Sequence, residues 1–318
     1  MTKIYKFEPH YFERVWGGRS LEKLLGRQIP KNNMIGESWD LVDREDCQSM
    51  CTSKGVDKLN LRKLLSKDHK NVMGPGWNEE WRFPVLVKWL DCANRLSLQV
   101  HPPREIAEKF SGEPKTENWY VAHATSDAGL FIGLKKGASK ELFLQALKMG
   151  TLESLCHRIK SRTGDSILVE SGRLHAIDGG NLILEIQQNS DTTFRVYDWD
   201  RRNTDGSTRK LHVEESLECI DFHDFEPSIT STNSSPCQVL ADCEHFRIRK
   251  FLGNENQVFK LKGSNEQSLI LNPIDSEVTV GNGSIFPGEL GLSPYQSECL
   301  VHFKNKGDLI VTDQYFVP

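Results

Sequence analysis

The chain has 318 residues, of which 26% are charged and 37% are hydrophobic, as in an ordinary globular protein. Its 40 Lys and Arg against 44 Asp and Glu give a formal charge of −4, which excludes a general attraction to nucleic acid or anionic membranes. The N-terminal segment is too charged for a signal peptide, and no apolar run approaches the roughly 20 residues of a membrane span. An anionic substrate would therefore need a local cationic site.

Short β-branched or aromatic runs, separated by Gly, Pro, Asn and Asp, predict a mainly β protein. Before residue 223 the expected strands lie in segments 83–91, 95–101, 165–171, 182–188 and 192–199. Helical periodicity is clear around residues 61–65 and over residues 140–158, where leucines recur at helical spacing. The chain contains neither a fixed repeat nor a Gly-rich phosphate loop.

A Ser-, Thr- and Pro-rich stretch at residues 223–237 predicts an exposed connection between two domains. Beyond it, closely spaced strand signals over residues 246–313 predict a small β-sandwich or barrel. His245 and His302 stand far apart in this second unit without matching carboxylates, so a structural role is expected for both. The predicted division is 1–225 and 226–318.

Eight cysteines are scattered without a CxxC pair in a chain too long to need disulfide staples. They are predicted to be reduced thiols of a cytoplasmic protein. Cys47 and Cys51 could suggest a metal pair, but no second pair or nearby histidine completes a tetrahedral zinc site. No structural zinc site is therefore expected there.

Polar residues recur two apart in segments that read as extended. Ser97, Gln99 and His101 share one face of a predicted strand, because side chains alternate across a strand. Lys115 and Glu117 share a face in the same way, although a surface salt pair would have this spacing too. A histidine at a strand end is more often structural than a metal ligand, so these residues alone leave the question open.

Further motifs follow in a fixed order: His175 after a Gly-bounded turn, then the segment from Glu185 to Asp198. Together with Gln99, His101 and Glu117, they resemble the type I mannose-6-phosphate isomerase family in its short bacterial form. The segments 16–18, 35–39 and 83–88 resemble the opening motifs of that family, and the resemblance extends from residue 5 to about residue 220.

The resemblance implies two cupin units, each a double-stranded β-helix or jelly roll. Residues 1–225 would form the catalytic zinc cupin with a helical elaboration at about 104–160, and residues 226–318 a metal-free jelly roll. One Zn²⁺ per chain would be bound by a set of four ligands: Gln99, His101, Glu117 and His175. Two imidazoles, a carboxylate and an amide oxygen suit zinc and leave coordination open to water or substrate.

The implied reaction interconverts mannose 6-phosphate and fructose 6-phosphate through a cis-enediol. Ser97, Lys115 and Arg195 are the expected substrate-binding residues, Arg195 for an oxyanion or phosphate and Lys115 for phosphate or, with a lowered pKa, for proton transfer. Asp191 and Glu185 are the candidate bases. Without the resemblance, Asp191 would be read as a turn cap and Glu185 as a buried salt-bridge partner. The expected partner is a small sugar phosphate, and the chain is expected to be a monomer or a weak homo-oligomer.

Two alternatives remain at this point: a non-catalytic zinc cupin that binds or senses a sugar phosphate, and an iron-dependent cupin oxygenase. The joint presence of Lys115, Asp191 and Arg195 favours an enzyme over a sensor, and Gln99 suits an iron oxygenase poorly. The chain departs from the family pattern at Pro103-Arg104 and at Arg173, near the expected pocket rim.

Overall fold

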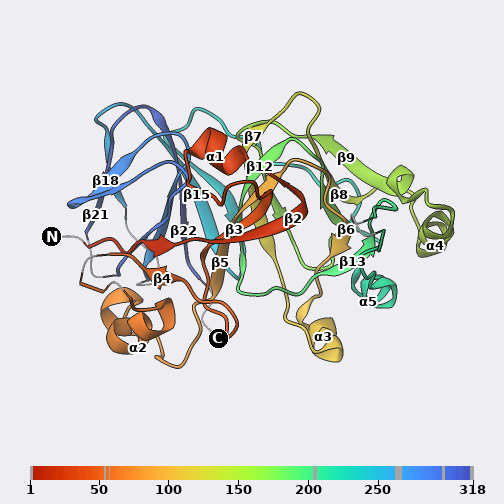
Figure 1. Ribbon diagram of the computed structural model, residues 1–318, viewed down its shortest axis with the longest axis horizontal. Helices are drawn as coiled ribbons and strands as arrows, with labels where there is room; N and C mark the ends of the chain where they lie inside the picture. The colour runs from red at the N-terminus through yellow and green to blue at the C-terminus, as the bar shows by residue number, and fades with distance from the viewer. Residues whose placement is uncertain are drawn as a thin grey trace.

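The computed structural model describes residues 3–53, 55–56, 58–202, 206–261, 267–295 and 298–315. The described strands form a two-stranded sheet and four larger antiparallel sheets. Figure 1 shows the later strands, in blue, at one end of an elongated molecule, with most of the helices at its periphery. The mainly β fold predicted from the sequence is confirmed.

A six-stranded sheet runs through the middle of the molecule in the order β10-β7-β12-β5-β3-β2 (Figure 1). Its central strands are buried along almost their whole length, as their near-continuous apolar sequences predict. The strand bounds are β2 His10–Gly18, β3 Ile35–Leu41, β5 Val85–Cys92, β7 Glu117–Ala124, β10 Ser166–Val169 and β12 Asn181–Gln188.

A five-stranded sheet in the order β13-β6-β11-β8-β9 packs against the six-stranded sheet. Its bounds are β6 Leu98–Val100, β8 Gly129–Leu134, β9 Cys156–Lys160, β11 His175–Ile177 and β13 Phe194–Tyr197. The apolar side chains between the two sheets include Trp119, Ile132 and Ile183. These two facing sheets form the frame of the candidate site.

The later part of the chain forms a five-stranded sheet, β14-β15-β22-β17-β20, and a four-stranded sheet, β16-β21-β18-β19. Their bounds are β14 Cys237–Asp242, β15 Arg247–Gly253, β16 Val258–Leu261, β17 Leu269–Pro273, β18 Val278–Val280, β19 Gly283–Ile285, β20 Gly291–Ser293, β21 Cys299–Phe303 and β22 Gly307–Asp313. The remaining pair is β1 Phe7–Glu8 with β4 Met50–Cys51.

One core cluster joins the six-stranded sheet to the later sheets. Val87 and Ile186 belong to the same cluster as Ile248 and Ile310, and all four are fully buried. A second cluster lies within the later sheets themselves. The division into domains 1–225 and 226–318 stays a prediction.

The helices are short: α1 Ser20–Leu25, α2 Leu61–Val72, α3 Arg104–Ala107, α4 Lys140–Met149, α5 Val213–Cys219 and the 3-10 turns η1 Glu108–Phe110 and η2 Leu152–Leu155. The single helix predicted over 140–158 is wrong, because Gly150 takes a left-handed conformation (φ 69°) that ends α4. Helical structure at 104–160 is likewise interrupted by β7, β8 and β9. No described helix has the length and apolarity to cross a membrane.

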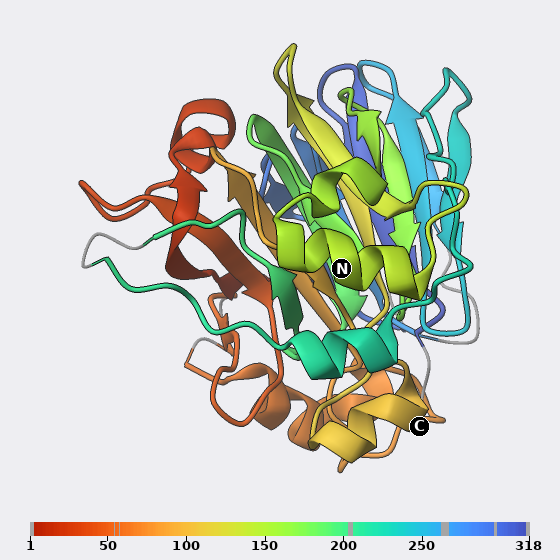
Figure 2. The ribbon, with the colours of Figure 1, turned by 90° about the vertical axis from the view of Figure 1, so that its right-hand side faces the viewer.

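Helices α4 and α5 cover the outer side of the five-stranded sheet (Figure 2). Leu98 and Val100 of β6 belong to the same outer core as Phe143 of α4. Because side chains alternate along a strand, Gln99 must then project to the opposite face, between the two sheets. The helical layer therefore fixes which face of β6 is apolar and which face is free for polar chemistry.

This packing predicts unequal effects for two adjacent residues of α4. Phe143→Ala removes a fully buried ring and should lower the free energy of unfolding by about 3 kcal/mol or more, because it leaves a cavity. Leu142→Ala removes a side chain that is 45% exposed and should cost well under half as much. Chemical denaturation of both variants tests this, and equal losses would contradict the proposed packing.

Candidate active site

Cross-strand pairing builds two rows of side chains that face each other between the sheets. In the five-stranded sheet, Gln99 of β6 pairs with His175 of β11 on one side and with Arg195 of β13 on the other. In the six-stranded sheet, Glu185 of β12 pairs with Lys88 of β5 and Trp119 of β7. Residues paired in this way share one face of their sheet. The functional side chains thus come from strands far apart in sequence.

Three side chains meet where these rows face each other. His101 follows β6, Glu117 begins β7 and His175 begins β11; all three are buried, and one ligand atom from each lies within 4.8 Å of the others. His101 Nε2 is 3.3 Å from Glu117 Oε2, and His175 Nε2 is 3.7 Å from Glu117 Oε1. This is the only such group of His, Cys, Asp or Glu among the described residues.

Backbone hydrogen bonds orient both imidazoles. His101 Nδ1 lies 2.9 Å from the Thr192 carbonyl oxygen, and His175 Nδ1 lies 2.8 Å from that of Arg173. A carbonyl only accepts, so each Nδ1 carries the proton and each Nε2 presents a lone pair. Anchoring of a ligand histidine through its other nitrogen is typical of metal sites.

The atoms of this group that face one another lack hydrogen-bond partners within the described part of the chain. His101 Nε2 and Glu117 Oε1 are buried without a hydrogen bond, a costly arrangement for polar atoms. Burial, together with Lys115, lowers the pKa of His101 to about 3, and burial also lowers that of His175. Both imidazoles are therefore neutral at pH 7, as metal ligation requires. The group fits a divalent metal ion.

Gln99 lies beside this group. Its side-chain Nε2 is 3.3 Å from His175 Nε2, and Ser97 Oγ is 3.5 Å from its Oε1. A rotation of the amide by half a turn exchanges its nitrogen and oxygen, so that the oxygen can face a metal held by the histidines. The structure thus brings all four predicted metal ligands together.

Lys115 and Glu117 form a buried pair, so the alternative of a surface salt pair is wrong. Lys115 is 4% exposed, and its Nζ lies 2.7 Å from Glu117 Oε2. Although burial opposes both charged forms, Lys115 holds the pKa of Glu117 well below its usual range, while Glu117 and Glu185 raise the pKa of Lys115. The lowered pKa that proton transfer by Lys115 would need is not found.

Glu185 is a buried carboxyl whose pKa is raised, in contrast to that of Glu117. Burial and the Glu117 carboxylate raise its pKa to about 7. Its Oε2 accepts a hydrogen bond from the Trp119 indole at 3.1 Å, and its Oε1 lies 3.7 Å from Lys88 Nζ and 3.9 Å from Lys115 Nζ. Glu185 therefore has the properties of both roles considered from the sequence. It is a buried ion-pair partner, and its pKa suits proton transfer near pH 7.

Sequence reasoning missed Lys88 as a site residue. Lys88 is 4% exposed on β5, and its Nζ lies near Glu37 (3.9 Å), Glu185 (3.7 Å) and Asp191 (4.0 Å). Lys88 and Arg14 lower the pKa of Glu37 to about 2 despite burial. A signal was present, because a lysine within the apolar run 83–90 must be buried with a partner.

Arg195 and Ser97 extend the site beyond Gln99. Arg195 Nε donates to Ser97 Oγ at 3.2 Å, and no described carboxylate lies within ion-pair distance of its guanidinium. Burial and the neighbouring Arg209 lower the pKa of Arg195, and burial also lowers that of Arg201. Arg201 Nη1 is buried without a hydrogen-bond partner among the described residues. Sequence reasoning did not single out Arg201.

The other residues named from sequence lie at the margins. Asp191 is 51% exposed and reaches the site through Lys88. The Arg173 side chain is held by Asp224 at 2.8 Å, while its carbonyl anchors His175. Arg104 and His245 line a separate pocket of about 440 Å³. Neither Cys47 nor Cys51 joins a metal-binding group among the described residues.

Comparison with known proteins agrees with the resemblance seen in sequence. The family model described as phosphomannose isomerase type I, catalytic domain, matches residues 4–124, which include Gln99, His101 and Glu117. A Bacillus subtilis protein named probable mannose-6-phosphate isomerase GmuF is 33% identical over 94% of this chain and 98% of its own length. The mannose-6-phosphate isomerase of Streptococcus mutans is 38% identical over 79% of each chain.

Solved structures show the same architecture. The crystal structure of mannose 6-phosphate isomerase from Bacillus subtilis superposes with a TM-score of 0.84 at 29% identity, covering 98% of this chain and 99% of that one. The fold is therefore that of the cupin-type phosphomannose isomerases. From the extent of these matches and the buried His-Glu-His group, the chain belongs to the type I phosphomannose isomerase family and is an isomerase.

Proposed function

We propose that the protein interconverts mannose 6-phosphate and fructose 6-phosphate with a zinc ion held by Gln99, His101, Glu117 and His175. One observation carries the proposal: two imidazole lone pairs and a buried carboxylate converge within 4.8 Å. When bound, the zinc supplies a Lewis acid that stabilises negative charge on a substrate oxygen. The relatives' names and the acid-base groups beside this cluster support catalysis over binding alone.

Glu185 is our candidate for the base. Isomerisation of the aldose needs a group that takes the C2 proton, leaving a cis-enediol, and returns a proton to C1 while another moves between O2 and O1. A carboxyl with a pKa of about 7 can both accept and return a proton at neutral pH. Lys88 and Lys115, both within 4 Å of Glu185 Oε1, stabilise its charged form before it takes the proton.

The phosphate end of the substrate is assigned to Arg195 with Ser97, assisted by Arg201. Arg195 offers a charged fork that matches a phosphate group. Ser97 Oγ lies between Arg195 Nε (3.2 Å) and the side-chain amide of Gln99 (3.5 Å), so it connects this cationic end to the proposed metal site. The local positive charge required by a chain of net charge −4 is then concentrated at one end of the site.

We also propose that the protein works in the reducing cytoplasm, on a small sugar phosphate and without nucleic acid or membrane. All eight cysteines are free thiols, and Cys237 is exposed, which suits a compartment where thiols stay reduced. A monomer or a weak homo-oligomer remains our expectation for its assembly.

Metal removal should abolish the activity. We expect about one zinc per purified chain, complete loss of isomerase activity after chelation, and recovery on adding zinc. His175→Ala and Glu117→Ala should lose most of the metal, measured by elemental analysis, because each removes a ligand. His123→Ala, at an exposed histidine, is the matched control and should keep its zinc. Full zinc content in the Glu117 variant would contradict the ligand assignment.

Arg195→Ala should retain zinc but lose about 10²–10³-fold in kcat/KM for mannose 6-phosphate, since a half-buried cationic donor is lost. Arg195→Lys should recover only part of this activity, because an ammonium cannot make the bidentate contact. Arg82→Ala, at an exposed arginine, serves as the control. Normal steady-state kinetics for Arg195→Ala would exclude the role assigned to it.

Replacing each candidate carboxylate by the corresponding amide shows whether Glu185 or Asp191 is the base. Glu185→Gln should lower kcat by about 10²–10⁴-fold, and Asp191→Asn by far less. In the native enzyme kcat/KM should fall as the pH drops through an apparent pKa of about 7 or below, because protonation disables the base and the metal's charge favours the carboxylate. A larger loss in Asp191→Asn than in Glu185→Gln would transfer the role to Asp191.

A further inference from the structure

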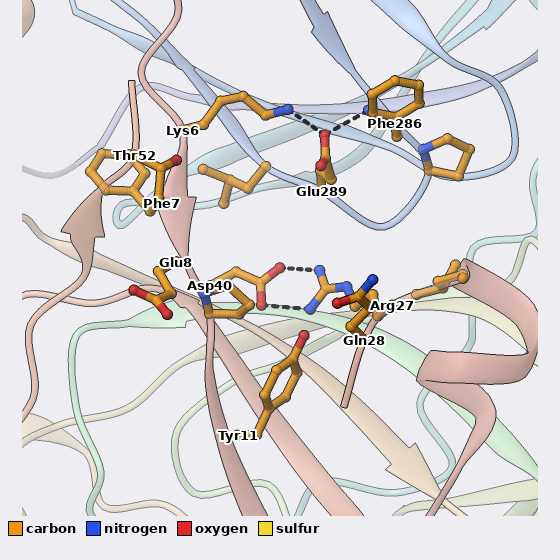
Figure 3. Close-up of a pocket in the computed structure, with 15 residues that line it drawn as sticks. Lys6, Phe7, Glu8, Tyr11, Arg27, Gln28, Asp40, Thr52, Phe286 and Glu289 are labelled. Carbon is orange, nitrogen blue, oxygen red and sulfur yellow. Dashed lines mark hydrogen bonds and ion pairs between the residues drawn. The ribbon is translucent and has the colours of Figure 1, made fainter. Parts of the chain in front are cut away.

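A second pocket, of about 780 Å³, lies apart from the proposed zinc site (Figure 3). It is lined by the strand region 6–11, the end of α1, Asp40 of β3 and the loop 286–290 of the later sheets. None of the residues assigned to the proposed isomerase site lines it. Its volume falls in the range of about 300–1,000 Å³ typical of small-molecule sites.

Two ion pairs face each other across this pocket (Figure 3). On one side, Lys6 Nζ contacts Glu289 Oε2 at 2.5 Å. On the other, the Arg27 guanidinium forms a two-pronged pair with Asp40, whose Oδ1 also accepts a hydrogen bond from Ser38. The Lys6 and Glu289 side chains, 29% and 38% exposed, present a charged donor and a charged acceptor to the pocket, whereas Arg27 and Asp40 are nearly buried and hold the opposite wall together.

The charge of the lining disfavours a phosphate. Glu8, Asp40 and Glu289 outnumber the two cations, and both cations are already paired with carboxylates. An anion would have to displace one of these carboxylates. A phosphorylated sugar is thus the ligand for the Arg195 end of the isomerase site and not for this pocket.

Aromatic surface completes the lining. Phe7, Tyr11 and Phe286 all border the pocket, and Phe286 is 49% exposed although it is large and apolar. Aromatic faces of this kind cover the apolar face of a ring-shaped ligand, and the hydroxyl of Tyr11 points toward the Arg27 and Asp40 pair (Figure 3).

We propose that this pocket binds a neutral oligosaccharide. Each sugar hydroxyl both donates and accepts a hydrogen bond, and adjacent hydroxyls match an ion pair that offers a donor and an acceptor together. The aromatic rings pack against the C–H faces of the sugar rings, and the absence of surplus positive charge selects an unphosphorylated ligand. The volume accommodates a short oligosaccharide.

The test is isothermal titration calorimetry of the zinc-loaded 318-residue chain with a panel of neutral disaccharides that differ in sugar and linkage. At least one should bind saturably, and Phe286→Ala should weaken that binding about tenfold or more while isomerase activity stays unchanged. Val258→Ala, which truncates an exposed apolar residue elsewhere in the later sheets, should bind normally. Tyr11→Phe, which removes only the hydroxyl, should also weaken binding.

Three outcomes would overturn this proposal: no saturable binding across the panel, unchanged affinity in Phe286→Ala, or displacement of the disaccharide by mannose 6-phosphate, which would place it in the isomerase site. The isomerase assay on the same samples separates this result from the proposed function, since the two sites share no lining residue. A negative result for oligosaccharide binding therefore does not affect the proposed isomerase function, and the reverse also holds.

Discussion

The convergence of two unprotonated imidazole nitrogens on one buried carboxylate is the interaction on which the site depends. Lone pairs and a negative charge repel one another at the distances of 3.3 and 3.7 Å found here, and all three side chains are buried, which makes this repulsion costly. A cation between them removes this cost. Lys115 neutralises one carboxylate oxygen from the other side, which leaves Glu117 charged and its second oxygen free.

Backbone hydrogen bonds and the packing of the outer helices together hold this arrangement in place. The carbonyl groups of Thr192 and Arg173 fix the imidazole tautomers, and the outer helices bury the apolar face of β6 so that its polar face must point inward. The convergence of these candidate metal ligands is therefore a consequence of which face each strand can bury, with backbone hydrogen bonds setting the final orientation.

The buried carboxyl groups differ in pKa because their neighbours differ. Glu37 and Glu117 stay charged because basic side chains contact them directly, whereas Glu185 has only more distant lysines and a pKa near 7. Strand β3 also separates two polar regions: Glu37 faces Lys88 beside the candidate active site, while Asp40, which is on the other face and accepts a hydrogen bond from Ser38, borders the second pocket. Because side chains alternate along β3, one strand places polar groups in both regions.

The sequence by itself determined the strand segments, the polar face shared by Ser97, Gln99 and His101, and, through family resemblance, the four residues proposed as metal ligands. These are local patterns, which a strand's period of two expresses directly. The helix over 140–158 was predicted too long because leucine spacing continues past Gly150, whose left-handed backbone ends the helix. Only the tertiary structure decided the burial of the pair formed by Lys115 and Glu117, and the roles open to Lys88 and Arg201. Their neighbours arrive from other strands through nonlocal pairing, and desolvation and charge depend on those neighbours, whereas periodicity along one segment carries no information about them.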